Sequence, residues 1–201
     1  LQTPVRIQEE RSASASLGAD SVNSGIYAGL VGAVLTVVCV LAYYRLAGLV
    51  ALIALTVNML MLFGAMAMFN QVLTLPGIAG VILTLGMAID ANVLIYERLR
   101  EEMEAGKSLK AALDAAYSKA FSAIFDSNIT TLITALILFW MATGPVRGFA
   151  VTLTIGIIAS MFTALIVTRN LFSWGLHLGW IRSISMSNLI GATKLFVLFP
   201  A

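Results

Sequence analysis

The stretch "GMAIDANVLIYERLREE", residues 86–102, decides how the rest of the sequence is interpreted. Its first half is apolar enough to be the end of a membrane-spanning helix, yet Asp90 lies inside it. Its second half is crowded with charged residues, as expected where such a helix leaves the membrane. Ionisable residues inside membrane helices are rare and expensive, and they usually mark a functional site.

The composition is that of a membrane protein. Of the 201 residues, 60% are hydrophobic and only 11% are charged, whereas a soluble domain has about 25% charged residues. We therefore expect membrane lipid to be the main surroundings of the chain. The formal net charge is only +2, and no Lys/Arg-rich run with interleaved aromatic residues occurs, so we expect no nucleic-acid partner.

Uncharged runs predict an all-α membrane protein, a bundle of five transmembrane helices. A helix needs about 20 apolar residues to cross the hydrocarbon layer. The long uncharged run 46–89 can hold two helices, because Asn, Gln, Pro and Gly between residues 69 and 77 favour a turn. The predicted spans within the bundle, residues 24–172, are about 24–44, 47–68, 76–96, 121–142 and 149–172.

The distribution of basic residues predicts the orientation. Nine of the twelve Lys and Arg residues fall in segments on one side of the predicted spans, and basic residues favour the cytoplasmic side. Residues 1–23 are then the end of an external, periplasmic region. Residues 97–120 and the C-terminus are cytoplasmic, and residues 173–201 form a connector and the start of a further apolar segment.

The charged segment 97–120 is interpreted as helical. The third span continues into water, with ion pairs expected for Arg98/Glu102 and Arg100/Glu104. Gly106 is the expected end of that helix, and Ser108 is the expected N-cap of the next. Apolar residues then recur at helical spacing between residues 109 and 120. We expect a cytoplasmic amphipathic helix there, between spans three and four.

Asp90 and Asp126 are the two acids inside the predicted spans, both in the cytoplasmic halves. An acid whose neutral and charged forms are close in free energy can take up and release a proton, so both are candidates for a proton relay. A supporting polar seam is expected from neighbouring amides and hydroxyls: Asn92, Asn128, Thr130, Thr131 and Thr134. The alternative is that the acids only bond a neighbouring helix, and that each Thr bonds its own preceding turn.

Small residues indicate close helix packing. Gly25 and Gly29 form a ridge on the first span, and Gly156 and Ser160 form one on the fifth. Gly86 stands one turn before Asp90, where it would allow a neighbouring backbone to approach the acid. Such ridges more often serve packing than chemistry.

Enzymatic chemistry is not indicated. His177 is the single histidine, which excludes a metal site built from several histidines. No phosphate-binding glycine loop and no nucleophile–base set occurs. We expect no enzyme, no metal and no cofactor.

The stretch at residues 86–102 resembles a signature of the SecD/SecF protein-export family, within the RND superfamily. Further resemblance lies in "VRIQEERSASASLGADSVNSG", in "YYRLAGLVA" and in "FDSNITTLITALILFWMATGPVRGFAVTLTIGIIASMFTALIVTR". The likeness covers about residues 4–172 and would make the five spans the second to sixth of SecD. Ile89 and Ser127 stand where Val and Ala are more usual. The tail "ISMSNLIGATKLF" faintly resembles the start of a SecF half, as in a SecD–SecF fusion.

The resemblance implies a function in protein export across the bacterial inner membrane. A subunit of this family would work with SecF (separate or fused), the SecYEG channel and YajC, and would use the proton gradient to promote translocation of preproteins. The important membrane aspartate of the family falls on Asp90, and a second motif falls on Asp126, Asn128, Thr130 and Thr131. The alternatives are another RND-type proton-driven exporter, or a scaffold of the translocon that transports nothing itself.

Overall fold

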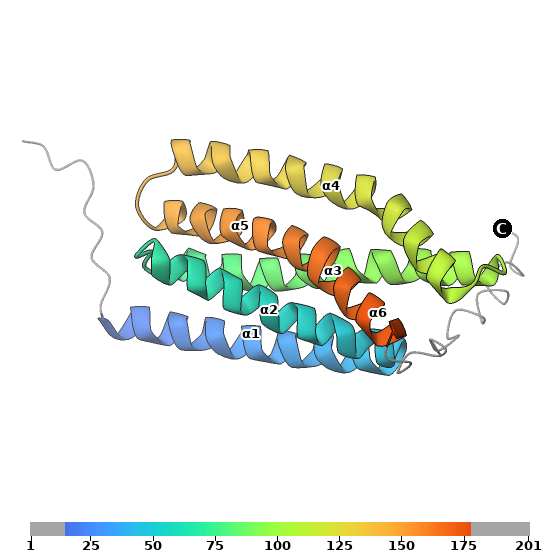
Figure 1. Ribbon diagram of the computed structural model, residues 1–201. Helices are drawn as coiled ribbons and strands as arrows, with labels where there is room; N and C mark the ends of the chain where they lie inside the picture. The colour runs from blue at the N-terminus through green and yellow to red at the C-terminus, as the bar shows by residue number, and fades with distance from the viewer. Residues whose placement is uncertain (1–14, 178–201) are drawn as a thin grey trace, which may run out of the picture.

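The computed structural model describes residues 15–177, and nearly all of this range is helical. Five helices are long and apolar enough to cross a membrane, which confirms the expected all-α bundle. The helices, drawn in Figure 1, are α1 (Ala15–Tyr44), α2 (Leu46–Met68), α3 (Leu75–Glu104), α4 (Leu109–Met141), α5 (Pro145–Phe162), the π-helical turn η1 (Thr163–Val167) and α6 (Thr168–His177). The expectations for residues 1–14 and 178–201 concern segments outside the described residues.

α3 and α4 both extend beyond their predicted spans into the charged segment 97–120. α3 continues to Glu104, as the charged segment after residue 96 suggested. α4 begins at Leu109, so the expected amphipathic helix and the fourth span are one continuous helix. Nothing between Leu109 and Met141 interrupts it, because this stretch contains neither Gly nor Pro. Figure 1 shows α4 curving toward α3 near this N-terminal end.

α3 is the central helix of the bundle. It contacts α1, α2, α4 and α5, whereas α4 packs mainly on α3 and α5. Figure 1 shows α4 and α1 on opposite sides of the bundle. α4 and α1 therefore present most of their surfaces to the surroundings, and α3 is largely enclosed.

The contact between α3 and α5 is built from glycines facing threonines. A Cβ atom added to Gly80 would overlap Thr152 of α5, and one added to Gly156 would overlap Thr84 of α3. A Cβ atom at Gly148 would likewise overlap Thr74, just before α3. Glycine on one helix thus accommodates threonine on the other, and the two backbones lie close together.

Thr74 also ties the first turns of these two helices together. Its hydroxyl oxygen accepts a hydrogen bond from the Gly77 N–H at 3.1 Å and caps α3. The same hydroxyl donates to the carbonyl of Pro145 at 3.1 Å, at the start of α5. The register between α3 and α5 is therefore fixed at this end.

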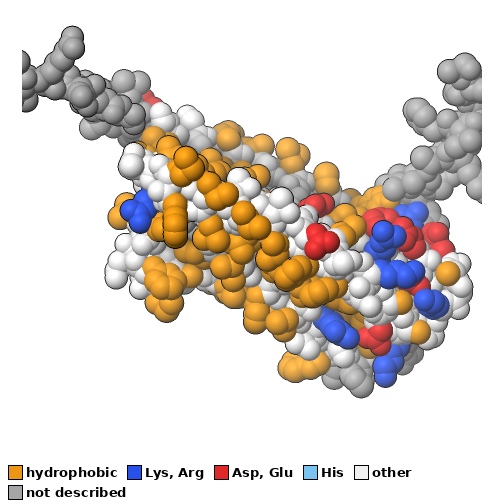
Figure 2. Space-filling model, turned by 90° about the horizontal axis from the view of Figure 1, so that it is seen from above, with side chains coloured by type: hydrophobic (Ala, Val, Ile, Leu, Met, Phe, Trp, Pro, Cys, Tyr) orange, Lys and Arg blue, Asp and Glu red, His pale blue; other side chains and the backbone are white. Residues whose placement is uncertain are grey.

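The opposite end of the bundle holds an aromatic core and most of the charge. Tyr96 of α3 lies between Tyr44 and Phe172, with ring centroids 5.4 and 5.6 Å away. Figure 2 shows charged side chains gathered beyond the apolar surface at one end of the visible face. The arrangement is that of a membrane helix bundle with one strongly charged end.

Ion pairs at this charged end lie within α3 and between α3 and α4. Arg100 pairs with Glu104 at 3.2 Å, as predicted. The predicted pair of Arg98 with Glu102 is wrong, because Arg98 pairs with Glu101 at 2.7 Å. Glu102 is instead turned inward, where it binds Lys107 of the connecting turn and Lys119 of α4. Helical spacing could not predict the contact of Glu102 with Lys119, because the two residues lie on different helices.

The turn between α3 and α4 follows Gly106 and Ser108. Gly106 has a positive φ of 85°, directly after α3 ends, a conformation that favours glycine. Ser108 precedes α4 at the N-cap position, but its side chain makes no capping hydrogen bond. The predicted end of the third helix is therefore correct, and the predicted cap is correct in position only.

Replacing Gly156 by Ala tests the packing of α3 on α5. The added Cβ would collide with Thr84, and forced overpacking of a tight contact typically destabilises by about 1–3 kcal/mol. We expect this loss in the free energy of unfolding of the full-length protein, measured by denaturant titration in detergent. The matched control is Gly64→Ala, where a Cβ meets nothing within 4 Å. Equal stability of the two variants would contradict the packing described here.

Candidate functional site

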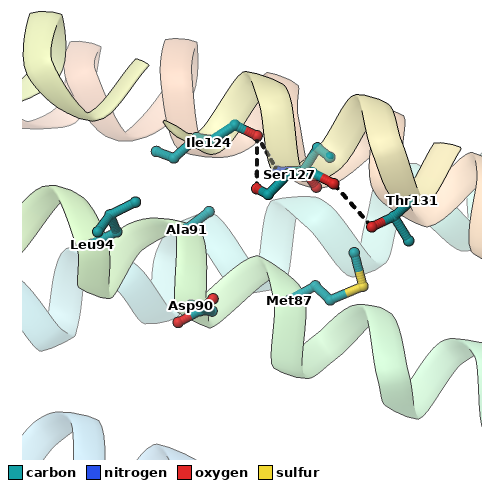
Figure 3. A pocket seen from close by; sticks show the side chains of 8 residues that line it. Met87, Asp90, Ala91, Leu94, Ile124, Ser127 and Thr131 are labelled. Atoms are coloured by element: carbon teal, nitrogen blue, oxygen red, sulfur yellow. Dashed lines mark hydrogen bonds between the residues drawn. The ribbon is translucent and has the colours of Figure 1, made fainter. Parts of the chain in front are cut away.

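A groove beside Asp90 is the candidate site. It lies between α3 and α4, has a volume of about 240 Å³, and is lined by side chains of both helices. Asp90 of α3 and Ser127 and Thr131 of α4 all line the groove. Figure 3 shows Met87 and Ala91 of α3 directed toward α4, with the Asp90 carboxyl group at the other edge of α3. Asp90 is exposed, and within the described part of the chain it forms no hydrogen bond or ion pair. Its carboxyl group is thus available to water, a proton or a partner chain.

The α4 wall of the groove is polar. Asn128 is buried and donates to the Ile124 carbonyl at 2.7 Å, so its amide oxygen is left to the groove. Ser127 donates to the same carbonyl at 3.1 Å, and Thr131 donates to the Ser127 carbonyl at 2.9 Å. Each hydroxyl oxygen can still accept a hydrogen bond. The wall therefore offers acceptors for water or for a protonated acid.

The rest of the predicted seam does not lie in this groove. Asp126, Thr130 and Thr134 are exposed on α4, and none of them lines the groove. Thr130 and Thr134 donate to backbone carbonyls one turn back, at 2.8 and 3.0 Å. These two hydroxyls thus bond the preceding turn of their own helix, which was the alternative to a polar seam. Because these three residues are exposed, the described helices do not enclose them, and their role in a polar seam stays a prediction.

The small residues lie at different kinds of contact. Gly25 and Gly29 of α1 face Ile78 and Ile82 of α3. Ser160 is buried, and its hydroxyl donates to the carbonyl of Ile157. Gly86 meets nothing within 4 Å of an added Cβ, so no backbone of the described chain approaches Asp90 there. The space beside Gly86 and Asp90 is open on the surface of this chain.

Asn92 lies on a different side of α3 from Asp90. Two residues along a helix turn a side chain by about 200°, and Asn92 is accordingly buried. Its amide nitrogen donates to the Ala88 carbonyl at 2.9 Å, and its amide oxygen accepts from the Thr168 hydroxyl of α6 at 2.9 Å. Asn92 therefore joins two helices and lines no part of the Asp90 groove.

A second set of buried polar residues lies where α5 and α6 meet α2 and α3, and sequence reasoning missed its threonines. The signal that could have revealed part of this set is the four-residue spacing of Gly80 and Thr84, and of Thr152 and Gly156, which is typical of close helix pairs. Its members are Asn58, Thr84, Thr152, Thr163 and Thr168.

The chemistry available to the groove is proton binding. The described residues contain no group of three His, Cys, Asp or Glu side chains that could hold a metal ion. An unpaired, exposed carboxyl group in a groove that also carries hydroxyl and amide groups can bind a proton and exchange it with water. The predicted Asp90, Asn128 and Thr131 share this groove, whereas Asp126 lies next in sequence to a groove residue, Ser127.

Comparison with known proteins decides the family. A family model described as "Protein export membrane protein SecD/SecF, C-terminal" matches residues 2–177. The chain belongs to this family. It is similar to the protein translocase subunit SecD of Syntrophobacter fumaroxidans, 53% identical over 92% of this chain and 35% of the relative. It is also similar to SecD of Magnetococcus marinus, 56% identical over 84% of this chain and 32% of the relative.

A solved structure supports the same fold. The crystal structure of SecDF from Thermus thermophilus, a translocon-associated membrane protein, is 39% identical, with a TM-score of 0.80. The match covers 90% of this chain and 26% of that one. The present chain thus spans about a third of the length of the SecD relatives that it matches. Family membership and five apolar helices make it part of a multi-pass membrane protein.

A cysteine placed in the groove tests whether water reaches it. In a background with Cys39 replaced by Ser, we expect Ser127→Cys to react with a small polar thiol reagent at least several times faster than Ile133→Cys. Both positions lie on the exposed part of α4, but only position 127 lines the groove, and a thiol needs water to form its reactive thiolate. Equal rates, measured on the full-length protein in lipid, would argue against a hydrated groove.

Proposed function

We propose that this chain is the membrane part of a SecD subunit of the Sec protein-export machinery, and that the subunit uses the proton gradient to promote preprotein translocation. In this proposal Asp90 carries the proton. Asp126 is a second candidate relay, because it adjoins Ser127 at the edge of the groove. The proposal extends to the whole subunit, of which this chain is about a third.

Two kinds of support come from family membership. The relatives are named protein translocase subunit SecD, and the similar solved structure is described as translocon-associated. By that analogy the partners would be SecF (separate or fused), the SecYEG channel, YajC and the preprotein in transit. The location would be the bacterial inner membrane, with the charged end of the bundle in the cytoplasm.

The observation that carries the proposal is the unpaired carboxyl group of Asp90. It lies within a helix otherwise suited to the membrane interior, where a charged side chain costs about 2.5–3.5 kcal/mol on insertion scales. The described residues supply no cation to offset that charge. Protonation removes the charge, so the free energy of the helix in its surroundings depends on whether a proton is bound.

A proton gradient can use this dependence. One elementary charge that crosses 100 mV releases about 2.3 kcal/mol. That energy shifts a two-state equilibrium by roughly fifty-fold, whereas a change from 1:99 to 99:1 needs about 5.5 kcal/mol. The potential alone therefore biases a rearrangement, and a pH difference or a second proton must supply the remainder.

Asp90→Asn in the full-length protein tests the carrier role. Asn resembles a permanently protonated Asp and cannot release a proton, so we expect assembly to be retained and the gradient-dependent part of export to be lost. The measurement is preprotein translocation into membrane vesicles, with the proton gradient intact or collapsed by an ionophore. Glu101→Gln is the control, because Glu101 is an exposed acid that pairs only with Arg98 in the same turn region.

The same translocation assay, run also on vesicles that lack the whole subunit, separates the competing functions. A scaffold without transport activity predicts that Asp90→Asn exports normally and keeps its response to the gradient, which would defeat the proton-carrier proposal. Another RND-type exporter predicts that preprotein export is unaffected by loss of the whole subunit. We expect neither result.

A further inference from the structure

The joint between α5 and α6 is a single π-helical turn. In η1, Thr163–Val167, the N–H of Thr168 bonds the carbonyl of Thr163, five residues earlier instead of four. Single π turns inside α-helices are rare and frequently lie at functional sites. This turn separates α5, which is clamped to α3 by glycine–threonine contacts, from α6.

Buried polar contacts hold both ends of the turn. At its start, the Asn58 amide of α2 lies 3.5 Å from the Thr163 hydroxyl. At its end, the Thr168 hydroxyl donates to the Asn92 amide oxygen of α3 at 2.9 Å. All four side chains are buried, each at most 2% exposed. Apolar packing alone would not require these polar side chains. A buried polar group that lacks a hydrogen-bond partner costs free energy, so such contacts favour one arrangement of the helices.

The Thr168 hydroxyl has one proton and two acceptors. Besides the Asn92 oxygen at 2.9 Å, the carbonyl of Thr163 lies 3.0 Å away. Since a hydroxyl donates one hydrogen at a time, the proton points either across to α3 or back into its own helix. The Thr163 hydroxyl likewise has two acceptors, the carbonyls of Ala159 at 3.0 Å and Ser160 at 3.1 Å. The polar contacts of the turn thus have an alternative arrangement available.

Asn92 connects this turn to the candidate site. It lies two residues after Asp90 on the same rigid helix, so a shift or rotation of α3 at Asp90 moves Asn92 as well. The outer part of α5 is fixed to α3 by the Gly80–Thr152 and Gly156–Thr84 contacts. The segment that can respond separately is therefore α6, which contacts α3 through Thr168 and, one turn later, through Phe172 on Tyr96.

We propose that the Thr168–Asn92 hydrogen bond is a latch that couples the helix of Asp90 to α6 across the π turn. The bond is closed in one charge state of Asp90 and turned back to Thr163 in the other. Thr168 and Asn92 are positioning residues here and do not bind the transported proton. This inference rests on the proposed function of Asp90 and adds the element that its charge moves.

The first test uses export by the full-length protein. Thr168→Val keeps the shape of the side chain and removes the donor, whereas Thr168→Ser keeps the hydroxyl. We expect Thr168→Val to retain gradient-independent export and to lose most of the gradient-dependent increment, and Thr168→Ser to keep it. Thr154→Val is the matched control, because the Thr154 hydroxyl bonds only the Ala150 carbonyl of its own helix. If Thr168→Val instead fails to assemble, Asn92→Leu removes the acceptor and carries the same expectation.

The second test reads the latch without relying on export. Backbone hydrogen exchange across residues 163–172 is measured in full-length protein, with Asp90 intact and with Asp90→Asn. We expect Asp90→Asn to change the rate of this exchange severalfold in protein with native Thr168 and in the Thr168→Ser variant. We expect Asp90→Asn to have no effect on the exchange rate in the Thr168→Val variant. An equal response of the Val and Ser backgrounds would overturn the latch.

The two tests distinguish failure of the latch from failure of the proposed function. If Asp90→Asn abolishes the gradient-dependent increment and Thr168→Val does not, the proton-carrier role stands and the latch is wrong. If neither variant alters export, the proposed function fails, and the exchange measurement alone decides whether α3 and α6 are coupled.

Discussion

Close contact between α3 and α5 is the constraint on which the rest of the structure depends. Threonines fill the spaces left by Gly80 and Gly156, so neither helix can rotate about its axis without a steric clash. With α3 held in this way, its buried side is committed to α5 and α6. The side that carries Asp90 is then left for the groove with α4 and for whatever lies outside the chain.

The two sides of α3 consequently have different physical tasks. Asn92 is buried and hydrogen-bonded to Ala88 and Thr168, whereas Asp90 is exposed and unpaired in the described chain. A carboxyl group left in this state inside an apolar helix is tolerable only if a proton, water or protein neutralises it. Gly86 leaves space beside it. The chain spans about a third of the length of its relatives, and no part of the described chain covers Asp90.

The sequence was sufficient to predict some of these features and not others. The helices were predictable because uncharged apolar runs of about 20 residues typically form membrane-spanning helices. Asp90 was noticeable because charged residues are rare inside such helices. The rotation of α4 was not predictable, since its hydroxyls occur on several sides and only the packing shows that Thr130 and Thr134 face outward. Pairing of α3 with α5, which are not consecutive, depends on tertiary contact. The π turn inserts one residue and leaves no mark in composition.

A proton carrier at Asp90 must change its protonation state within the assembled protein. Infrared difference spectroscopy of the full-length protein in lipid measures this directly, once the carboxyl band of Asp90 has been assigned by its absence in a variant lacking that acid. We expect the band of the protonated carboxyl group to grow and disappear as the pH is varied across the range in which the protein stays folded. A band that remains constant, or remains absent, over that whole range would show that Asp90 does not carry a proton.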